Sequence, residues 1–243
     1  MSLPTASTRH NAVSAMFGRI APGYDAANRI LSFGVDALWR RCLVGGVESA
    51  FLPGSRRRIL DLAAGTYDVS LALVRVIPGA QVVAVDFCLP MLQAGKGKLG
   101  AAGAYAQNRI TPVAGDGLRL PLQDACVDAA TVSFGLRNMR PRDAALAEAY
   151  RVLVPDGVFH ILEFGSAKGR LWGGLYNVYL TKILPFVGGL ITGDREAYDY
   201  LAQTIEEFPD ASALADEMRH AGFREVTARK LWGGIVYLHT GKK

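Results

Sequence analysis

Short apolar runs that alternate with helix-periodic segments are the feature that most constrains the fold of this chain. The expected strands are Arg58–Ala63, Gln81–Asp86, Ile110–Ala114, Val127–Phe134 and Val158–Phe164, and helical spacing occurs over Val69–Val76, Pro90–Leu99 and Asp143–Val154. Parallel strands need long crossover connections, which are usually helices. The alternation therefore predicts a parallel sheet with helices on both faces.

The two ends of the chain follow other patterns. Apolar residues at helical spacing predict helices over Asn11–Val47, with a break at Ala21–Gly23, where proline and glycine occur. Near the C-terminus we expect a helix over Ala211–Ala221, then strands at Phe223–Lys230 and Gly234–Thr240. The short connection between these strands predicts an antiparallel hairpin. The whole pattern indicates an α/β fold with a doubly wound, seven-stranded, mostly parallel sheet of the Rossmann-like kind and an N-terminal helical cap.

Length and composition set the remaining bounds. A chain of 243 residues, 50% hydrophobic and 20% charged, suits one large globular domain. We expect no secretory signal, because no early apolar run has a basic flank and a cleavage site. The three cysteines are far apart and show neither disulfide nor metal-ligand spacing. A reducing cytoplasm is therefore the expected location.

Arginines are concentrated in the first 58 residues. Eight arginines and three acidic residues occur there, which by itself equals the +5 formal charge of the chain. Such a segment could face an anionic membrane surface or an acidic ligand. A solvated face is the plainer interpretation, and we prefer it. Nucleic acid is not expected as a partner, because the arginines are not interleaved with aromatic residues on which bases could stack.

A long apolar stretch, Leu171–Ile191, has more than one interpretation. Asn177, Lys182, Pro185 and several glycines interrupt it, which argues against a membrane-spanning helix. It could form a lid, an apolar wall for a hydrophobic substrate, or a segment at a membrane surface. A pair of helices packed into the core is the structural alternative, and the sequence leaves these alternatives open.

Polar residues stand where the first two strands end, which is where an open parallel sheet binds ligands. The first strand passes through Asp61 into a turn that contains Gly65, and glycine lets the backbone approach a ligand. The second ends in Asp86, roughly 20 residues after the turn, the spacing of an acid that binds a ribose. Tyr67 and Asp68 occupy the helix start that a phosphate would need, and Asp68 would repel a pyrophosphate. A nucleoside without phosphates fits better, and S-adenosylmethionine is such a ligand.

The next two strand ends carry further candidates. Asp116 and Gly117 follow the third strand, where an acid could accept a hydrogen bond from an adenine amino group. Ser133 lies at the end of the fourth strand. Arg137 and Asn138 follow it and offer donors to an oxygen that gains negative charge. Each of these residues could instead be an ordinary turn or loop residue.

A set of longer motifs extends over nearly the whole chain. In the first half they are Met16–Asp25 with Asn28, Leu31–Asp36 with Trp39 and Arg40, Leu60–Ala63 with Gly65 and Thr66, and Val85–Phe87 with Pro90–Leu92. In the second half they are Ser133–Asn138, Glu148 with Tyr150–Leu153, Leu162–Phe164, Gly193–Tyr198, Tyr200, Leu201, Phe208, Pro209 and Gly233–Ile235. With these motifs the chain resembles the ubiquinone/menaquinone biosynthesis C-methyltransferases. Ser133–Asn138 and Gly193–Tyr198 are specific, whereas the acid–glycine turn indicates only the broad methyltransferase class.

The resemblance implies a class I methyltransferase that uses S-adenosylmethionine, and no metal, to methylate a carbon of a prenylated quinol. It places the cofactor at the Asp61–Gly65 turn and at Thr66, Asp86, Asp116, Gly117 and Ser133. It places Tyr24, Arg137 and Asn138 at the substrate as catalytic residues. Demethylmenaquinol is the expected substrate, and the benzoquinol of the ubiquinone pathway is the second candidate. A peripheral contact with the inner face of the membrane and a homodimer both stay open.

The expected organisation is one methyltransferase domain. Residues 1–55 would form the helical cap, 56–165 the cofactor-binding core, 166–210 a lid over the substrate, and 211–243 the C-terminal helix and hairpin.

Tyr67 departs from the resemblance, because the family usually has glycine there. Its side chain could intrude on the cofactor pocket, be strained at a positive φ, or turn away. Ala64 is a smaller departure, and Cys88 would be a poorer helix cap than the usual serine. Because of Tyr67, a binding or scaffold protein with weakened catalysis stays an alternative function. A nucleotide-dependent oxidoreductase is disfavoured by the missing glycines and by Asp68.

Overall fold

The computed structural model of the chain describes residues 6–51, 57–165 and 179–243. Residues 166–178, which include much of the apolar stretch Leu171–Ile191 and of the expected lid, lie outside the described residues. So do residues 1–5 and 52–55 of the expected cap and residue 56 of the expected core.

Seven strands form one sheet in the order β3-β2-β1-β4-β5-β7-β6. The strands are β1 (Arg57–Leu62), β2 (Ala80–Asp86), β3 (Ile110–Ala114), β4 (Val127–Ser133), β5 (Leu153–Phe164), β6 (Arg224–Leu231) and β7 (Val236–Lys242). β1 to β5 pair in parallel, whereas β7 runs antiparallel to both of its neighbours. The predicted seven-stranded sheet and its terminal hairpin are confirmed. The prediction placed the start of the fifth strand at Val158, and the structure extends this strand back to Leu153.

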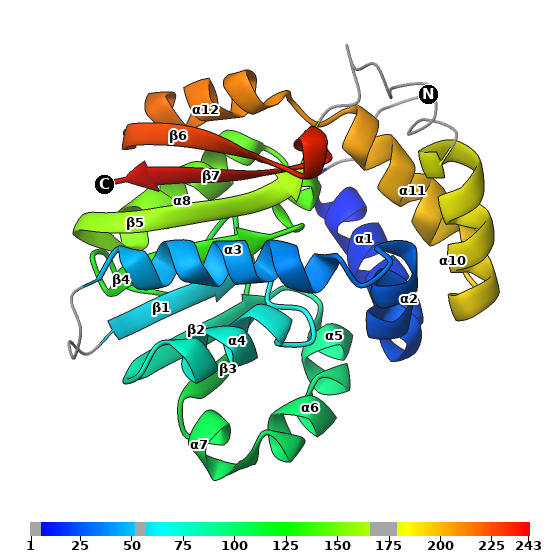
Figure 1. The fold of residues 1–243 in the computed structure, drawn as a ribbon, viewed down its shortest axis with the longest axis horizontal. Coiled ribbons are helices and arrows are strands. Elements are labelled where there is room, and N and C mark those ends of the chain that lie inside the picture. Colours follow the sequence, from blue (N-terminus) through cyan, green and yellow to red (C-terminus); the bar gives the residue numbers. More distant parts are fainter. Residues whose placement is uncertain (1–5, 52–56, 166–178) are drawn as a thin grey trace.

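Helices cover both faces of the sheet, as the alternation predicted (Figure 1). α3 (Asp36–Ser49) and α4 (Asp68–Val76) bury Leu43 and Leu73 against one face. α8 (Arg142–Val152) and α12 (Ala211–His220) bury Leu146 and Leu214 against the other. The predicted helix Pro90–Leu99 is two helices, α5 (Leu89–Ala94) and α6 (Lys96–Ala101), which meet at Gly95. A further short helix, α7 (Gly103–Gln107), was not predicted.

Four helices gather at one end of the sheet (Figure 1). They are α1 (Ala6–Ile20), α2 (Tyr24–Leu31), α10 (Leu184–Thr192) and α11 (Arg195–Glu206). α1 and α2 are separated by a 3-10 turn at Ala21–Gly23, the predicted break. Ile20, Ala27, Leu184 and Ile205 form a small core among these helices. The helices thereby form a layer over the carboxyl ends of the central parallel strands.

Three arginines of the N-terminal segment form ion pairs with acidic residues of the same chain. Arg19 Nε lies 2.7 Å from Asp194, at the start of α11. Arg40 Nη1 lies 2.5 Å from Asp36, and Arg29 Nε lies 3.7 Å from the same aspartate. These three arginines are therefore partly neutralised by neighbouring carboxylates, and the preference for a solvated face stays a prediction.

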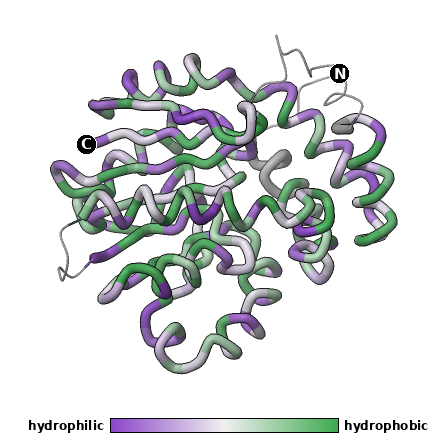
Figure 2. The backbone as a smooth tube through the Cα atoms, in the orientation of Figure 1, coloured by the Kyte–Doolittle hydropathy of each residue, from purple (hydrophilic) through white to green (hydrophobic). Residues whose placement is uncertain are grey.

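α10 is the most apolar of the described helices. It lies at the edge of the molecule, where Figure 2 shows a hydrophobic segment. Leu184 and Pro185 are buried, whereas Phe186 and Leu190 are exposed. The described part of the apolar stretch is therefore partly core and partly surface. Among the described residues, no helix has both the length and the apolar character needed to cross a bilayer.

Candidate active site

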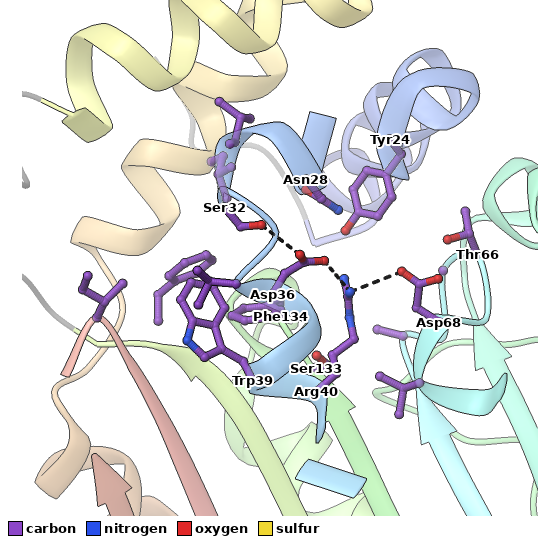
Figure 3. Close-up of a pocket in the computed structure, with 18 of the residues that line it drawn as sticks. Tyr24, Asn28, Ser32, Asp36, Trp39, Arg40, Thr66, Asp68, Ser133 and Phe134 are labelled. Atoms are coloured by element: carbon purple, nitrogen blue, oxygen red, sulfur yellow. Dashed lines mark hydrogen bonds and ion pairs between the residues drawn. The ribbon is translucent and has the colours of Figure 1, made fainter. Parts of the chain in front are cut away.

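A pocket of about 640 Å³ lies at the carboxyl ends of β1 and β4, next to α2 and α3 (Figure 3). Its wall is formed by residues of the cap between positions 24 and 40, by the end of β1 and the turn after it without Leu62 and Tyr67, and by residues of the loop after β4 between positions 133 and 137. This is the edge at which a doubly wound sheet binds its ligands. The turn and the loop touch directly, because a Cβ atom on Gly135 would lie only 2.4 Å from the Cβ of Ala63.

Asp61 is a buried acid at the base of the pocket. The Ser70 hydroxyl donates to its Oδ2 at 2.5 Å, and the Thr131 hydroxyl donates to its Oδ1 at 3.2 Å. Burial raises the pKa of the Asp61 carboxyl from 3.8 to about 6, although both hydrogen bonds lower it. The carboxylate is therefore largely ionised at neutral pH and suited to attract a cationic group.

Asp86 holds the turn after β1 from the neighbouring strand. Its two oxygens accept the N–H groups of Gly65 and Cys88, each at 2.8 Å. Burial raises the pKa of this carboxyl, and the two N–H donors oppose the rise. Cys88 begins α5 without a side-chain cap, as predicted, and its Sγ instead donates to the carbonyl of Ser14 in α1. The cap thus lies directly over the tip of β2.

Tyr67 turns away from the pocket. Its φ is +69°, in the left-handed region that favours glycine and costs other residues roughly 1–2 kcal/mol. The side chain is fully buried, and its hydroxyl donates to the carbonyl of Leu92 at 2.8 Å. Gly95 makes this possible, because a Cβ there would lie 2.6 Å from the tyrosine ring. The feature that suggested weakened catalysis therefore does not reach the pocket.

Lys98 joins the cap to the turn after β1. Its ammonium lies 2.7 Å from Asp25, 2.6 Å from Asp68 and 2.8 Å from the Thr66 hydroxyl. Thr66 in turn donates to Asp25 at 2.6 Å. Arg40 also lies 3.3 Å from Asp68. The expectation that Asp68 would repel a pyrophosphate is therefore weaker than the sequence indicated, because two cations compensate its charge.

Aromatic rings form the opposite wall of the pocket. The ring centroids of Trp39 and Phe134 are 5.9 Å apart, and those of Phe134 and Phe164 are 4.7 Å apart. The Arg137 guanidinium lies over Phe164, 5.6 Å from the ring centre. Its Nη1 is 3.2 Å from both oxygens of Glu163, which is buried. The wall therefore combines flat apolar surface with one fixed, partly neutralised cation.

Several buried polar atoms near the pocket have no hydrogen-bond partner among the described residues. They are Trp39 Nε1, Ser133 Oγ, Arg137 Nε and Asn138 Oδ1. An unpaired buried polar atom costs about 1–3 kcal/mol. Trp39, Ser133 and Arg137 line the pocket itself. These atoms and the acids around them suit a polar, partly cationic ligand such as S-adenosylmethionine.

The structure divides the predicted site residues into two groups. Tyr24, Asp61, Gly65, Thr66, Ser133 and Arg137 line the pocket. Asn138 lines a small neighbouring pocket that shares Tyr24 and Arg137 with the larger one. Asp86, Asp116 and Gly117 lie at the adjacent strand ends and do not line it. Their cofactor roles stay predictions.

Sequence reasoning missed the roles of Asp36, Trp39, Arg40, Lys98 and Glu163. Asp36, Trp39, Arg40 and Glu163 lie within motifs that carry the family resemblance, so the motif itself was the available signal. Nothing local singled out Lys98, because its three partners come from two segments far from it in the sequence, α2 and the turn after β1.

The strand order, the antiparallel β7 and the pocket at the strand ends define a class I S-adenosylmethionine-dependent methyltransferase. The chain belongs to the ubiE/COQ5 methyltransferase family, whose model matches residues 5–243. It is thus an enzyme with S-adenosylmethionine as methyl donor.

Individual proteins agree with this assignment. The demethylmenaquinone methyltransferase of Thermus thermophilus is 42% identical over 94% of this chain and 100% of its own length. A ubiquinone/menaquinone biosynthesis C-methyltransferase of Syntrophotalea carbinolica is 43% identical over 93% of this chain and 92% of its own. A solved S-adenosylmethionine-dependent methyltransferase of Thermotoga maritima covers 95% of this chain and 99% of its own, with a TM-score of 0.61. At 17% identity, that last likeness supports the fold alone.

Proposed function

We propose that this enzyme methylates a ring carbon of demethylmenaquinol and so forms menaquinol. The observation that carries the proposal is the aromatic wall beside Arg137, in the pocket at the strand ends where a doubly wound sheet binds its ligands. A flat quinol ring suits this wall, and its hydroxyl oxygen suits the cation. The names of the relatives at 42% and 43% identity support the same substrate class.

The chemistry needs a ring carbon that is electron-rich. Loss of a proton from a ring hydroxyl makes the neighbouring carbon nucleophilic. The bound methyl donor supplies an electrophilic methyl group on a sulfonium. The carbon–methyl bond forms as the sulfur–methyl bond breaks, the electron pair stays on sulfur, and loss of the ring hydrogen as a proton restores the aromatic ring.

The described residues contribute to this reaction through electrostatics and position. Arg137 stabilises the negative charge on the ring oxygen, aided by its burial at 5% exposure. Glu163 keeps the guanidinium in place, because it also accepts the backbone N–H of Arg137 at 3.2 Å. Tyr24 and Asn138 are proposed to contact the quinol or a water molecule that takes its proton.

Exposed apolar residues surround the mouth of the pocket, and we propose that they rest against a membrane surface. Phe33, Ile183 and Trp232 line the pocket and are 85%, 46% and 55% exposed. Phe186 and Leu190 extend this surface along α10. We call these five residues the apolar mouth. A prenyl chain could remain in the bilayer while the quinol ring enters the pocket.

Mass spectrometry tests the reaction. The purified enzyme, S-adenosylmethionine and demethylmenaquinol should give a product with one added methyl group. Arg137→Ala should lower turnover about 100-fold or more while changing the cofactor Kd by less than about threefold. The exposed Arg219→Ala serves as the control variant. Because Arg137→Ala leaves Glu163 buried and unpaired, Arg137→Met/Glu163→Gln is measured beside it.

Two outcomes would contradict the proposal. Methylation of only the benzoquinol of the ubiquinone pathway would select the other substrate. An equal loss of turnover and cofactor affinity in both Arg137 variants would reject the role of this arginine at the acceptor ring.

A further inference from the structure

Arg40 places a largely shielded cation in the pocket wall, near the start of α3. Its side chain is 14% exposed, and Nη1 contacts Asp36 at 2.5 Å and Asp68 at 3.3 Å. Figure 3 shows the guanidinium between these two carboxylates, on the side of the pocket where Thr66 lies. Asp36 is itself 5% exposed and accepts the Ser32 hydroxyl at 2.9 Å. Asp36, which the Ser32 hydroxyl fixes in turn, therefore holds the Arg40 guanidinium from the α3 side.

The methyl donor of the family needs a cation at such a position. S-adenosylmethionine ends in an α-amino acid, so a carboxylate enters the pocket together with the sulfonium. A carboxylate removed from water requires a paired cation or several hydrogen bonds. Among the described residues that line the pocket, Arg40 and Arg137 are the two with a positive charge.

The two arginines face different parts of the pocket. Arg137 lies on the aromatic side, over Phe164, and its Nη1 is engaged by both oxygens of Glu163. Arg40 lies beside the turn after β1, through its contact with Asp68. That turn also follows Asp61, whose ionised carboxylate suits the ammonium of an amino acid. The Arg40 side of the pocket therefore offers complementary charges for both ends of a zwitterion.

We propose that Arg40 binds the carboxylate of the methionine half of S-adenosylmethionine. The contact of Arg40 with Asp68 is the longer of its two ion pairs, and Asp68 keeps Lys98 at 2.6 Å if that contact is exchanged for the ligand. Asp36 remains in contact with Arg40 and acts as a positioning residue. This assignment rests on the methyl donor of the family and is independent of which quinol accepts the methyl group.

Isothermal titration calorimetry with two ligands tests the assignment without any acceptor substrate. The ligands are S-adenosylmethionine and its decarboxylated form, which keeps the adenosine, sulfonium and amine and lacks only the carboxylate. Arg40→Gln should weaken binding of S-adenosylmethionine about 10- to 100-fold, the range of a charge-assisted hydrogen bond. Binding of the decarboxylated ligand should change less than about threefold, because the lost partner is absent from it.

Matched variants separate the ligand contact from the fold. Arg41→Gln, an exposed position beside Arg40 on α3, should leave both affinities unchanged. Arg40→Gln/Asp36→Asn replaces the ion pair by a neutral pair and should show the same ligand selectivity as Arg40→Gln. An equal loss for both ligands in the Arg40 variants would assign this arginine to the fold, and unchanged binding of S-adenosylmethionine would overturn the proposal. If the wild type binds neither ligand, the proposal fails together with the family's cofactor.

Discussion

Asp61 is a residue of the site whose buried carboxylate lowers the stability of the folded protein. The carboxyl is 1% exposed, and its side-chain partners are two neutral hydroxyl groups. Nearby Asp86 raises the pKa of Asp61 further, as a smaller contribution than burial. The backbone N–H of Ser70 is a third hydrogen-bond donor to this carboxylate, and the three hydrogen bonds only partly offset the cost of burying an anion without a cation. A cationic ligand group is the partner that this arrangement lacks among its described contacts.

Asp61→Asn should stabilise the ligand-free protein and weaken cofactor binding. The folded pKa of about 6 lies above the ordinary aspartate value of 3.8, so the folded state binds the proton more tightly than the unfolded chain. This group therefore lowers stability as pH rises from about 4 to about 6, and the full penalty of about 3 kcal/mol persists above that window. Asparagine removes the penalty, so urea unfolding should show a gain of about 1–3 kcal/mol at pH 8 and a smaller one at pH 5.

Two further measurements make this prediction specific. Asp199→Asn, at an exposed aspartate of α11, should show no comparable gain at either pH. The cofactor Kd of Asp61→Asn should rise about tenfold or more. A variant that is less stable at pH 8 than the wild type would contradict the interpretation of Asp61 as a destabilising buried charge.

The turn after β1 and the α5–α6 junction form one packed unit at the scale of secondary-structure elements. Tyr67 immediately precedes α4, and its ring lies so close to Gly95 at the junction that a Cβ atom there would clash with it. Besides the ring, the Cβ position of Gly95 would lie 2.9 Å from the backbone carbon of Thr66. The tyrosine and the glycine are therefore coupled, although 28 positions separate them in the sequence.

Gly95→Ala should destabilise the protein by about 1–3 kcal/mol, the usual cost of overpacking. The cost should fall by about 1 kcal/mol in a Tyr67→Gly background, because the ring contact is then gone and the backbone contact remains. Gly97→Ala on α6 is the matched control, since nothing lies within 4 Å of its Cβ position. This control should be neutral or slightly stabilising. Additive effects of Gly95→Ala and Tyr67→Gly in urea unfolding would contradict the coupling.

In the whole molecule, the cap and the apolar mouth lie at the same end of the sheet. Lys98 and Thr66 tie α2 to the turn after β1, so the cap closes one side of the pocket. The exposed apolar residues lie on its other side, on α10 and at the loops around residues 33 and 232. The same end of the molecule therefore holds the chemistry and the hydrophobic surface.

Phe186→Ser/Leu190→Ser should reduce binding to vesicles made of equal parts phosphatidylglycerol and phosphatidylethanolamine. Burial of one apolar side chain of this size in the membrane contributes about 1.5–3 kcal/mol to the free energy of binding. The double variant should therefore bind vesicles at least about tenfold more weakly, as measured by the bound fraction in co-sedimentation. Turnover of a water-soluble quinol with a short side chain should stay unchanged. Val76→Ser, at the far end of α4, is the control with a similarly exposed apolar residue. Vesicle binding that does not respond to the double variant would reject the apolar mouth as the contact surface.

Local sequence patterns predicted the architecture well, because the spacing of apolar residues in a helix or strand depends only on the residues of that element. β3 was predicted with both of its ends correct, and the hairpin of β6 and β7 followed from two strand patterns and a short connection. The break at Gly95 and the length of β5 were missed. Both involve neighbours, because Gly95 packs against the Tyr67 ring and Leu153, at the start of β5, pairs with Val127 of β4.

The amino-acid sequence by itself determined the sheet, the strand ends and the acids that stand there, and through its motifs the family. Only the tertiary structure decided which of these residues share a pocket. In the folded chain the Tyr67 side chain is buried in the core, Lys98 and Arg40 compensate the charge of Asp68, and Glu163 pairs with Arg137. The physical reason is that burial and ion pairing arise between segments far apart in the chain, and no local period in the sequence records which of them will meet.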